Sequence, residues 1–231
     1  MGDTTKSATS SAVYQQLKEQ ILHLDLPPGS AISEIDTASQ YNVSRTPVRD
    51  AFKALEMEGL LEIQPHVGTF VSLINLNEIS DILYMREVLE QAVLKDLSMH
   101  FTQSHLLQFN IILEHQKTLL ASDLDGLTLG KEFIKTDNEF HSSLFELAGK
   151  QNIWHFLSMV NQQYERFRTF INRTGKESLE SLYEEHCVIL DAISNKDLDR
   201  LSKTITNHIY GGFNRSSSVI YNYPSYFKTL K

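Results

Sequence analysis

The sequence has a single cysteine, Cys187, among its 231 residues, so no disulfide can form within the chain. A disulfide-stabilised scaffold is therefore excluded, and a reducing compartment, the cytoplasm, is expected. No apolar run approaches the roughly 20 residues of a membrane span. The first residues, MGDTTKSATSS, also lack the apolar core of a signal peptide. We therefore expect neither a membrane partner nor secretion.

Basic residues are scarce as well. The chain carries 21 Lys+Arg against 29 Asp+Glu, for a net charge of -8. Its first 74 residues hold five basic and nine acidic side chains, an acidic excess of four. A broadly basic surface is thereby excluded, and any attraction to a nucleic acid must come from a few cations placed together. The length favours two domains, the second of about 150 residues.

The most informative segment is VSRTPVRDAFKALEMEGLLEI, residues 43–63, which predicts a helix with two distinct faces. Ser44 is a favourable N-cap, and Pro47 falls in the first turn, where proline is tolerated. Apolar residues recur at helical spacing on one face, and basic residues step by four along another. Gly59 is placed to end the helix. The apolar face holds Val48, Ala51, Phe52 and Leu55, and the basic face holds Arg45, Arg49 and Lys53.

The segments on either side of this helix predict a DNA-binding winged helix-turn-helix. Residues 12–24 carry apolar side chains at helical spacing and run into the helix-breaking sequence LPPGS. Ser33 can cap a second short helix that reaches Tyr41, and the next few residues match the length of the turn. Downstream, LLEIQPHVGTFVS supplies two short strands around a turn. We therefore expect three helices followed by a small β-hairpin wing.

The blocks PPGS, VSRTPVRDAF, LEMEGLL and HVGTFV, in this order, resemble the winged helix of the GntR family of bacterial regulators over residues 11–74. The resemblance implies a recognition helix in the major groove of double-stranded DNA and a wing tip near the adjacent minor groove. Ile35 and Val67 stand where basic residues are common in the family, which implies fewer contacts per subunit. The implied DNA contacts are Ser44, Arg45, Thr46, Pro47, Arg49, His66, Gly68 and Thr69.

The implied contacts divide by chemistry. An arginine bound to both acceptors of a guanine discriminates bases by about 1 to 3 kcal/mol, whereas a phosphate contact only holds register. Arg45 or Arg49 is the better candidate for reading bases, and Ser44 and Thr46 are candidates for phosphate contact. Ser44 could equally act only as a helix cap. For the whole segment, the alternative is an ordinary amphipathic helix with solvated basic residues.

Helical periodicity without strand signals extends over residues 79–221. The short polar breaks favour an all-α antiparallel helical bundle, so the chain as a whole is predicted to be mainly α. We expect a disordered tail over residues 1–10, a linker over 75–78, and a tail over 222–231 whose aromatic residues favour packing on a neighbour. The bundle helices are predicted at about 78–99, 102–122, 128–148, 151–171, 178–194 and 197–221.

Polar residues interrupt the apolar faces of three of these helices. Asp137 and His141 lie four residues apart, so their side chains share a face. His186 precedes a run of Val, Ile and Leu, and His208 lies between two isoleucines. Three helices could direct one carboxylate and three imidazoles into one cavity. Taken singly, however, each histidine is more often a hydrogen-bonded core or surface residue.

The segments DNEFHSSLFELAGKQN, YEEHCVILDAISNKDLDRL and NHI resemble the FCD domain of the FadR-type branch of GntR regulators, over nearly all of residues 79–215. In many such domains an Asp and three His bind a divalent metal. The resemblance implies the same role here for Asp137, His141, His186 and His208. Imidazole and carboxylate ligands suit zinc or nickel best and are compatible with manganese.

One arginine, Arg86, lies on the apolar stripe of the first bundle helix, where an unpaired charge would be costly. Glu90, one turn later, is its simplest partner. The family pattern R-x-x-L-E implies instead the carboxylate of a small effector, and the two partners could alternate. Arg168 and Asn161 are further candidates for groups in the same pocket.

Together these patterns predict a homodimeric transcriptional regulator that binds a roughly palindromic operator, with repression as the expected mode. A small carboxylate effector bound near the metal would change its affinity for DNA. Two alternatives stay open. One is a DNA-binding dimer with a purely structural helical domain, and the other is a metal-dependent enzyme, which would leave the winged helix unexplained. We expect no catalytic residues.

Replacing Arg49 with alanine removes the cation best placed to read a base. We expect Arg49→Ala to lower the affinity for a specific operator by about tenfold or more, because a bidentate contact to guanine contributes roughly 1 to 3 kcal/mol. Titration of a labelled operator at fixed salt concentration measures this loss. Unchanged affinity would count against the assignment of Arg49.

Overall fold

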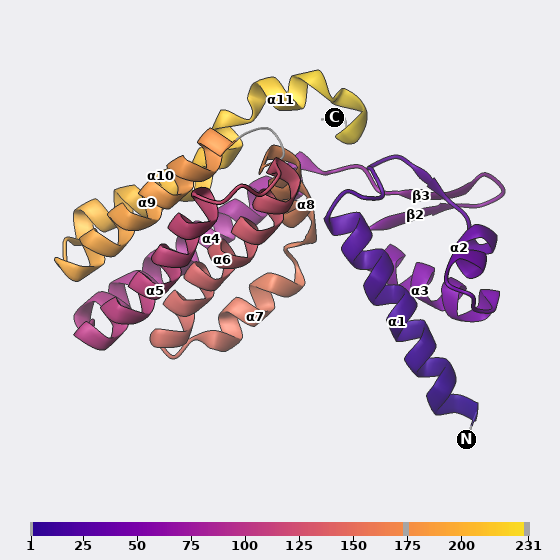
Figure 1. Cartoon of the computed structure of the whole chain (residues 1–231), viewed down its shortest axis with the longest axis horizontal. Coiled ribbons are helices and arrows are strands. Elements are labelled where there is room, and N and C mark those ends of the chain that lie inside the picture. Colours follow the sequence, from indigo (N-terminus) through magenta and orange to yellow (C-terminus); the bar gives the residue numbers. More distant parts are fainter. Residues whose placement is uncertain (1, 173–175, 229–231) are drawn as a thin grey trace. The chain divides into compact units, whose positions relative to one another are not determined.

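The computed structural model describes residues 2–172 and 176–228 and is mainly helical with one small sheet (Figure 1). The chain divides into two compact units. The first combines the N-terminal residues up to Leu76 with the C-terminal residues from Tyr223, and the second is Asn77–Asn222. The predicted order, a winged helix followed by a helical bundle, is confirmed.

The first unit is a winged helix-turn-helix with three helices and three short strands. Its sheet has the order β1-β3-β2, and both pairings are antiparallel. The predicted hairpin corresponds to β2 and β3, whereas β1 was not expected because two residues carry no strand signal of their own. The elements are α1 (Gly2–Leu22), β1 (Ala31–Ile32), α2 (Glu34–Gln40), α3 (Arg45–Met57), β2 (Leu61–Gln64) and β3 (Gly68–Val71).

Apolar side chains of α1 and α3 form the core of this unit. The face of α3 predicted to be apolar is buried, as are side chains spaced along α1. Gly59 has a φ of +71° just beyond α3, which matches the predicted helix end, since glycine adopts this conformation without strain. The core includes Val13, Leu17 and Ile21 from α1 and Val48, Phe52 and Leu55 from α3.

The two predicted helix caps differ in the structure. The hydroxyl oxygen of Ser33 accepts hydrogen bonds from the backbone N–H groups of Ile35 and Asp36, so the cap of α2 is confirmed. Ser44 occupies the N-cap position of α3, but its side chain makes no capping hydrogen bond within the described residues. The exposed hydroxyl of Ser44 is therefore not used for helix capping.

The N-terminal helix is longer than the sequence predicted. We expected a disordered tail over residues 1–10 and a helix from about residue 12, whereas α1 begins at Gly2. The physical reason is the lack of a helix breaker, because no glycine or proline lies between Asp3 and Leu26. The linker predicted over residues 75–78 is likewise mostly helical, because α4 begins at Leu76.

The second unit is the predicted bundle of helices. Its helix α6 contacts α5, α7 and α8, while α9 packs against α5 and α10, so the polar faces noted in the sequence are turned toward one interior. None of the helices within residues 2–172 and 176–228 is long and apolar enough to cross a membrane. The helices are α4 (Leu76–Met99), α5 (Gln103–Leu120), α6 (Gly126–Leu147), α7 (Gln151–Met159), α8 (Gln162–Asn172), α9 (Lys176–Ser194), α10 (Leu198–Arg215) and α11 (Ser217–Asn222).

Two predicted bundle helices are each broken into two. The helix expected over residues 151–171 stops at Met159, whose carbonyl oxygen accepts a hydrogen bond of 2.8 Å from the Gln162 side chain. The helix expected over 197–221 breaks at Ser216, whose hydroxyl donates to the carbonyl of Phe213. Side chains thus replace backbone partners at both breaks. Neither break contains glycine or proline, so neither could be predicted from the usual helix-breaking residues.

Candidate metal centre and DNA interface

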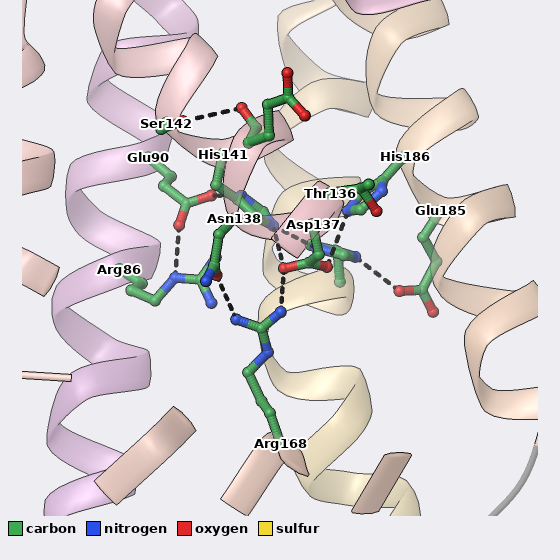
Figure 2. A network of polar contacts seen from close by, with 12 residues as sticks. Arg86, Glu90, Thr136, Asp137, Asn138, His141, Ser142, Arg168, Glu185 and His186 are labelled. Atoms are coloured by element: carbon green, nitrogen blue, oxygen red, sulfur yellow. Dashed lines mark hydrogen bonds and ion pairs between the residues drawn. The ribbon is translucent and has the colours of Figure 1, made fainter. Parts of the chain in front are cut away.

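Four polar side chains meet inside the bundle. Asp137 and His141 project from the same face of α6, His186 comes from α9 and His208 from α10, and all four are buried. Figure 2 shows the first three pointing toward one another. One ligand atom from each of the four lies within 4.8 Å of those of the others. The residues singled out by the sequence are therefore brought together.

Two of the imidazoles are fixed by carboxylates on the side away from the cluster. His141 Nδ1 lies 2.7 Å from Glu90 Oε2, and His208 Nδ1 lies 2.8 Å from Glu185 Oε2. A carboxylate with its pKa lowered can only accept, so each Nδ1 carries the proton. The Nε2 atom of each ring then faces the cluster.

The third imidazole, His186, is held by a neutral amide. Its Nδ1 lies 3.0 Å from Oε1 of Gln116, a carbonyl oxygen, so Nδ1 donates and Nε2 carries the lone pair. His186 Nε2 is buried and has no hydrogen-bond partner among the described residues. It lies 3.5 Å from Oδ1 of Asp137. A buried acceptor without a donor is costly, so this atom indicates a missing positive partner.

The same need arises between the other two rings. His141 Nε2 and His208 Nε2 are 3.0 Å apart. Two ring nitrogens that both carry lone pairs repel each other at this distance. A proton or a metal ion between the two nitrogens removes that repulsion. The donor set of three imidazole nitrogens and one carboxylate fits a divalent ion such as zinc.

Burial keeps these imidazoles in the form that binds metal. It lowers the pKa of His141, although the charge of Glu90 partly offsets the effect. It lowers the pKa of His186 further, well below the ordinary value, with the neighbouring His208 adding to the shift. Both rings are therefore neutral at physiological pH, which is the state required of a metal ligand.

The buried carboxylates at the site remain ionised. Burial alone would raise the pKa of Asp137, but the Arg168 guanidinium holds it well below its usual range. Burial would likewise raise the pKa of Glu90, but the Arg86 guanidinium and the hydrogen bond from His141 lower it to about 2. Each carboxylate thus has a cationic partner, which is what a charge inside an apolar bundle requires.

A small cavity beside the cluster is lined by two arginines. Arg86 Nε donates to Glu90 Oε1 at 2.8 Å, while its Nη2 is buried without a hydrogen-bond partner in the described part of the chain. The guanidinium carbons of Arg86 and Arg168 lie 5.4 and 5.5 Å from the ring centre of Tyr164, within cation-π range. Arg86 therefore has the simple partner foreseen from the sequence, and it keeps donors for a second one. The cavity is lined by Arg86, Asp137, His141, Tyr164, Arg168, Ile171, Asn172, Leu182, His208 and Gly212.

Of the two further candidates for this pocket, one is at the site. Arg168 donates to Oδ2 of Asp137 at 2.5 Å and to Oδ1 of Asn138 at 2.7 Å (Figure 2). Asn161 is buried just before α8 and is not among the described residues that line the cavity. Gln116 was not predicted as a site residue. It is a polar residue on the buried apolar stripe of α5, and the same pattern had indicated Arg86 on α4. Glu185, next to His186, was overlooked as well.

In the winged helix, one carboxylate joins the two arginines predicted to read bases. Glu34, the first residue of α2, accepts hydrogen bonds from Arg45 Nη2 at 3.1 Å and from Arg49 Nη2 and Nε at 3.2 and 3.3 Å. The arginine side chains remain 56% and 53% exposed. The hydrogen bond from Arg49 is the main cause of a lowered Glu34 pKa. The turn between α2 and α3 thus presents both guanidinium groups together on an open face.

The other predicted contact residues divide by burial. Pro47 is buried, which commits its side chain to packing in the first turn of α3, and we remove it from the contact set. The predicted departures from the family, Ile35 and Val67, are 61% and 71% exposed, so apolar side chains occupy positions open to DNA. The remaining contacts are exposed at Ser44, Thr46, His66 and Gly68 and partly exposed at Thr69.

Comparison with known proteins identifies two domain families in the chain. The model of the FCD domain matches residues 81–211, and that of the bacterial regulatory proteins of the gntR family matches residues 9–71. The chain belongs to this family. It is a transcriptional regulator with a DNA-binding winged helix and an FCD domain, so the alternative of a metal-dependent enzyme is set aside.

Relatives of this gntR-family regulator match along most of the chain. The HTH-type transcriptional repressor RspR of Escherichia coli is 28% identical over 198 residues, covering 85% of this chain and 84% of the relative. A regulator from an unstable DNA locus of Streptomyces ambofaciens is 28% identical over 231 residues, covering 99% and 94%. The solved structure of E. coli McbR/YncC has the same fold, with a TM-score of 0.67, 18% identity, and coverage of 93% and 97%.

The carboxylate behind His208 gives a direct test of the candidate metal centre. Glu185→Gln keeps the shape of the side chain but weakens its hold on the Nδ1 proton, so we expect zinc affinity to fall about 10- to 100-fold. Competition with a chromophoric chelator measures the change. The neighbouring exposed Glu184 offers a matched control, Glu184→Gln, that should bind zinc like the wild type. Equal affinities in all three proteins would contradict the assigned role of Glu185.

Proposed function

We propose that this regulator is a homodimeric repressor whose affinity for its operator is set by a divalent metal and a small carboxylate effector in the FCD domain. The observation that carries the proposal is the convergence of Asp137 with the Nε2 atoms of three histidines, one of them buried without a hydrogen-bond donor. Arg45 and Arg49 would bind the operator, and the metal cluster would control how tightly they bind it.

The metal would be held by Asp137, His141, His186 and His208. Zinc or nickel fits best, and manganese is compatible, because imidazole nitrogen and carboxylate oxygen are acceptable ligands for all three ions. When bound, the ion would supply a positive charge with positions open to oxygen ligands. The neutral imidazoles and the ionised carboxylate described above support this reading, since none of these groups must change its protonation state before the ion binds.

The effector would enter the adjoining cavity as a small carboxylate. Arg86 supports this because its Nη2 has donors left after the bond to Glu90. Arg168 brings a second guanidinium, which Tyr164 shares with the first. A carboxylate accepts well-aligned hydrogen bonds from such groups and could also bind an adjacent metal. The bond between Arg168 and Asp137 means that effector and metal would compete or cooperate through the same side chains.

DNA would be bound by α3 and the wing. Arg45 and Arg49 would read bases, Ser44 and Thr46 would contact phosphates, and the wing residues His66, Gly68 and Thr69 would reach the neighbouring groove. Because the winged helix is acidic overall, the few cations of one subunit provide little affinity. Two subunits on a roughly palindromic operator would double the contacts.

An exposed apolar strip on α4 supports a homodimer. Tyr84, Met85 and Val88 are all more than 40% exposed along this helix. Asp81 and Lys95, both exposed, lie seven residues before and after Val88. A two-fold axis near Val88 would therefore place Asp81 of one subunit against Lys95 of the other, as a self-complementary interface requires. Repression as the mode is supported by the printed names of relatives, RspR and a probable D-xylose utilization operon transcriptional repressor of Paenarthrobacter nicotinovorans, which is 26% identical over 216 residues.

Metal analysis tests the proposal. Purified protein incubated with zinc and then desalted should retain one ion per chain, and the ion should raise the unfolding temperature, because a ligand at 100 times its dissociation constant adds about 2.7 kcal/mol. His141→Ala and His208→Ala should lose both effects, whereas His155→Ala, at an exposed site on α7, should keep them. Equal zinc retention in all four proteins would favour a purely structural helical domain.

A thermal-shift screen of small carboxylates then tests the effector. Carboxylates that stabilise the protein should do so more strongly with zinc present, because the ion and Arg86 would bind the same group. The variant Arg86→Lys keeps the charge that Glu90 needs but removes the forked donors. It should retain zinc and lose the carboxylate response. A full response in Arg86→Lys would contradict the assignment of Arg86.

A further inference from the structure

The C-terminal segment of this chain returns to the winged-helix unit and docks there. Phe227 pairs with Ile74 in a parallel bridge. The Ile74 N–H donates to the carbonyl of Tyr226, and the Lys228 N–H donates to the carbonyl of Ile74, both at 2.9 Å. Ile74 is fully buried and Phe227 is 6% exposed. The contact therefore combines paired backbone groups with burial of two large apolar side chains.

The docking surface consists of Gly29, Leu73 and Ile74. Gly29 has a φ of +80° in the PPGS turn, and its N–H donates to the carbonyl of Val71 at the end of β3. A Cβ at this position would lie 3.3 Å from Leu73 Cδ2 and 3.8 Å from the carbonyl oxygen of Ser225. The backbone conformation and the close approach of Leu73 favour glycine here, and the carbonyl of Ser225 lies within ordinary contact distance of the same position. The short 3-10 helix η1 (Pro224–Tyr226) delivers Phe227 to this surface.

The chain therefore joins the two units at two places. One connection runs from Ile74 directly into α4, which carries Arg86 and Glu90. The other runs from α10, which carries His208, through α11 and across the junction at Asn222 to Phe227. The bridge between Ile74 and Phe227 fastens these two connections to each other. Each connection leads back to a helix that contributes to the metal cluster or to the residues behind it.

The same two helices are also fastened inside the bundle. Gln91 on α4 donates to the hydroxyl of Thr206 on α10 at 3.0 Å, and that hydroxyl donates to Glu87 at 2.8 Å. Tyr210 on α10 donates to the other oxygen of Glu87 at 3.2 Å. Hydrogen bonds join α4 to α10 here, and the Ile74–Phe227 bridge joins the segments that continue from these helices. A displacement of one helix relative to the other would therefore strain the hydrogen bonds and the bridge.

The metal cluster acts on the end of α10 that leads into this segment. Glu185 accepts from His208 with one oxygen and from Arg215, in the last turn of α10, with the other at 2.9 Å. A change in the position of His208 would therefore move Glu185, the carboxylate that holds Arg215. Buried Ser216 follows and ends the helix, so the disturbance lies next to the start of the returning segment.

We propose that residues 223–228 form a second tether, which docks on Gly29, Leu73 and Ile74 and transmits the state of the metal cluster to the winged helix. This inference rests on the proposed metal function for its signal, but the docking itself stands on the backbone pairing of Ile74 and Phe227. With only the α4 connection, a movement of α10 would reach the winged helix only indirectly, through the hydrogen bonds between α10 and α4. With the tether docked, that movement pulls on the residue that follows the wing.

Hydrogen-deuterium exchange with and without zinc tests the tether in the full chain. Phe227→Ala removes the buried ring, and Tyr221→Ala, at an 84% exposed position on α11, is the matched control. Without zinc, we expect the Ile74 amide to exchange about tenfold faster or more in Phe227→Ala, because loss of a buried ring favours local opening. Tyr221→Ala should exchange like the wild type.

With zinc, the wild type and Tyr221→Ala should show altered exchange both at the end of α10 and at Ile74. In Phe227→Ala the change should remain at α10 and disappear at Ile74. Calorimetric zinc binding, measured in each protein, separates the two claims, and it should be equal in all of them. Zinc binding with an unchanged response at Ile74 in Phe227→Ala would overturn the tether. If the wild type fails to bind zinc, the proposed metal function and its transmission to Ile74 are both overturned. The docking of Phe227 is then tested separately by the exchange rate of the Ile74 amide without zinc.

Discussion

The clustering of three imidazoles and one carboxylate in a buried space is the constraint around which the polar residues of the bundle are arranged. Glu90, Gln116 and Glu185 each accept from an Nδ1 atom, so all three Nε2 atoms are left as acceptors that face inward. Inside an apolar bundle such a group of acceptors is unfavourable unless a cation joins it. The surrounding arginines do not supply this cation, because they form ion pairs with Glu90, Asp137 and Glu185. The centre of the cluster is thus prepared for a cation that the protein itself does not supply.

The winged-helix unit has few basic residues and a net acidic charge. Its acidic net charge provides no general attraction to DNA, so in the proposed function selectivity would depend on Arg45 and Arg49. Glu34 holds these two side chains side by side at the cost of neutralising part of their charge. In the proposed dimer, weak attraction per subunit would make the placement of the two winged helices decisive.

Much of this arrangement could be predicted from local sequence patterns. The spacing of Asp137 and His141 fixed their common helix face, and the apolar stripe around Arg86 required a buried partner for its charge. What the patterns could not reveal were contacts between distant segments, such as Gln116 with His186 or Ile74 with Phe227, because no periodicity links them. The helix breaks at Met159 and Ser216 depend on single side-chain hydrogen bonds and escaped prediction for the same reason.

X-ray absorption at the zinc edge of the zinc-loaded protein tests whether the three buried imidazoles and one carboxylate bind a metal ion, because the spectrum reports the atoms around the ion. We expect about three imidazole nitrogens near 2.0 to 2.1 Å and oxygen in the remaining positions. A spectrum with sulfur in the ion's shell, or with fewer than two imidazoles, would contradict it, because neither could arise from the cluster of Asp137 and the three buried histidines.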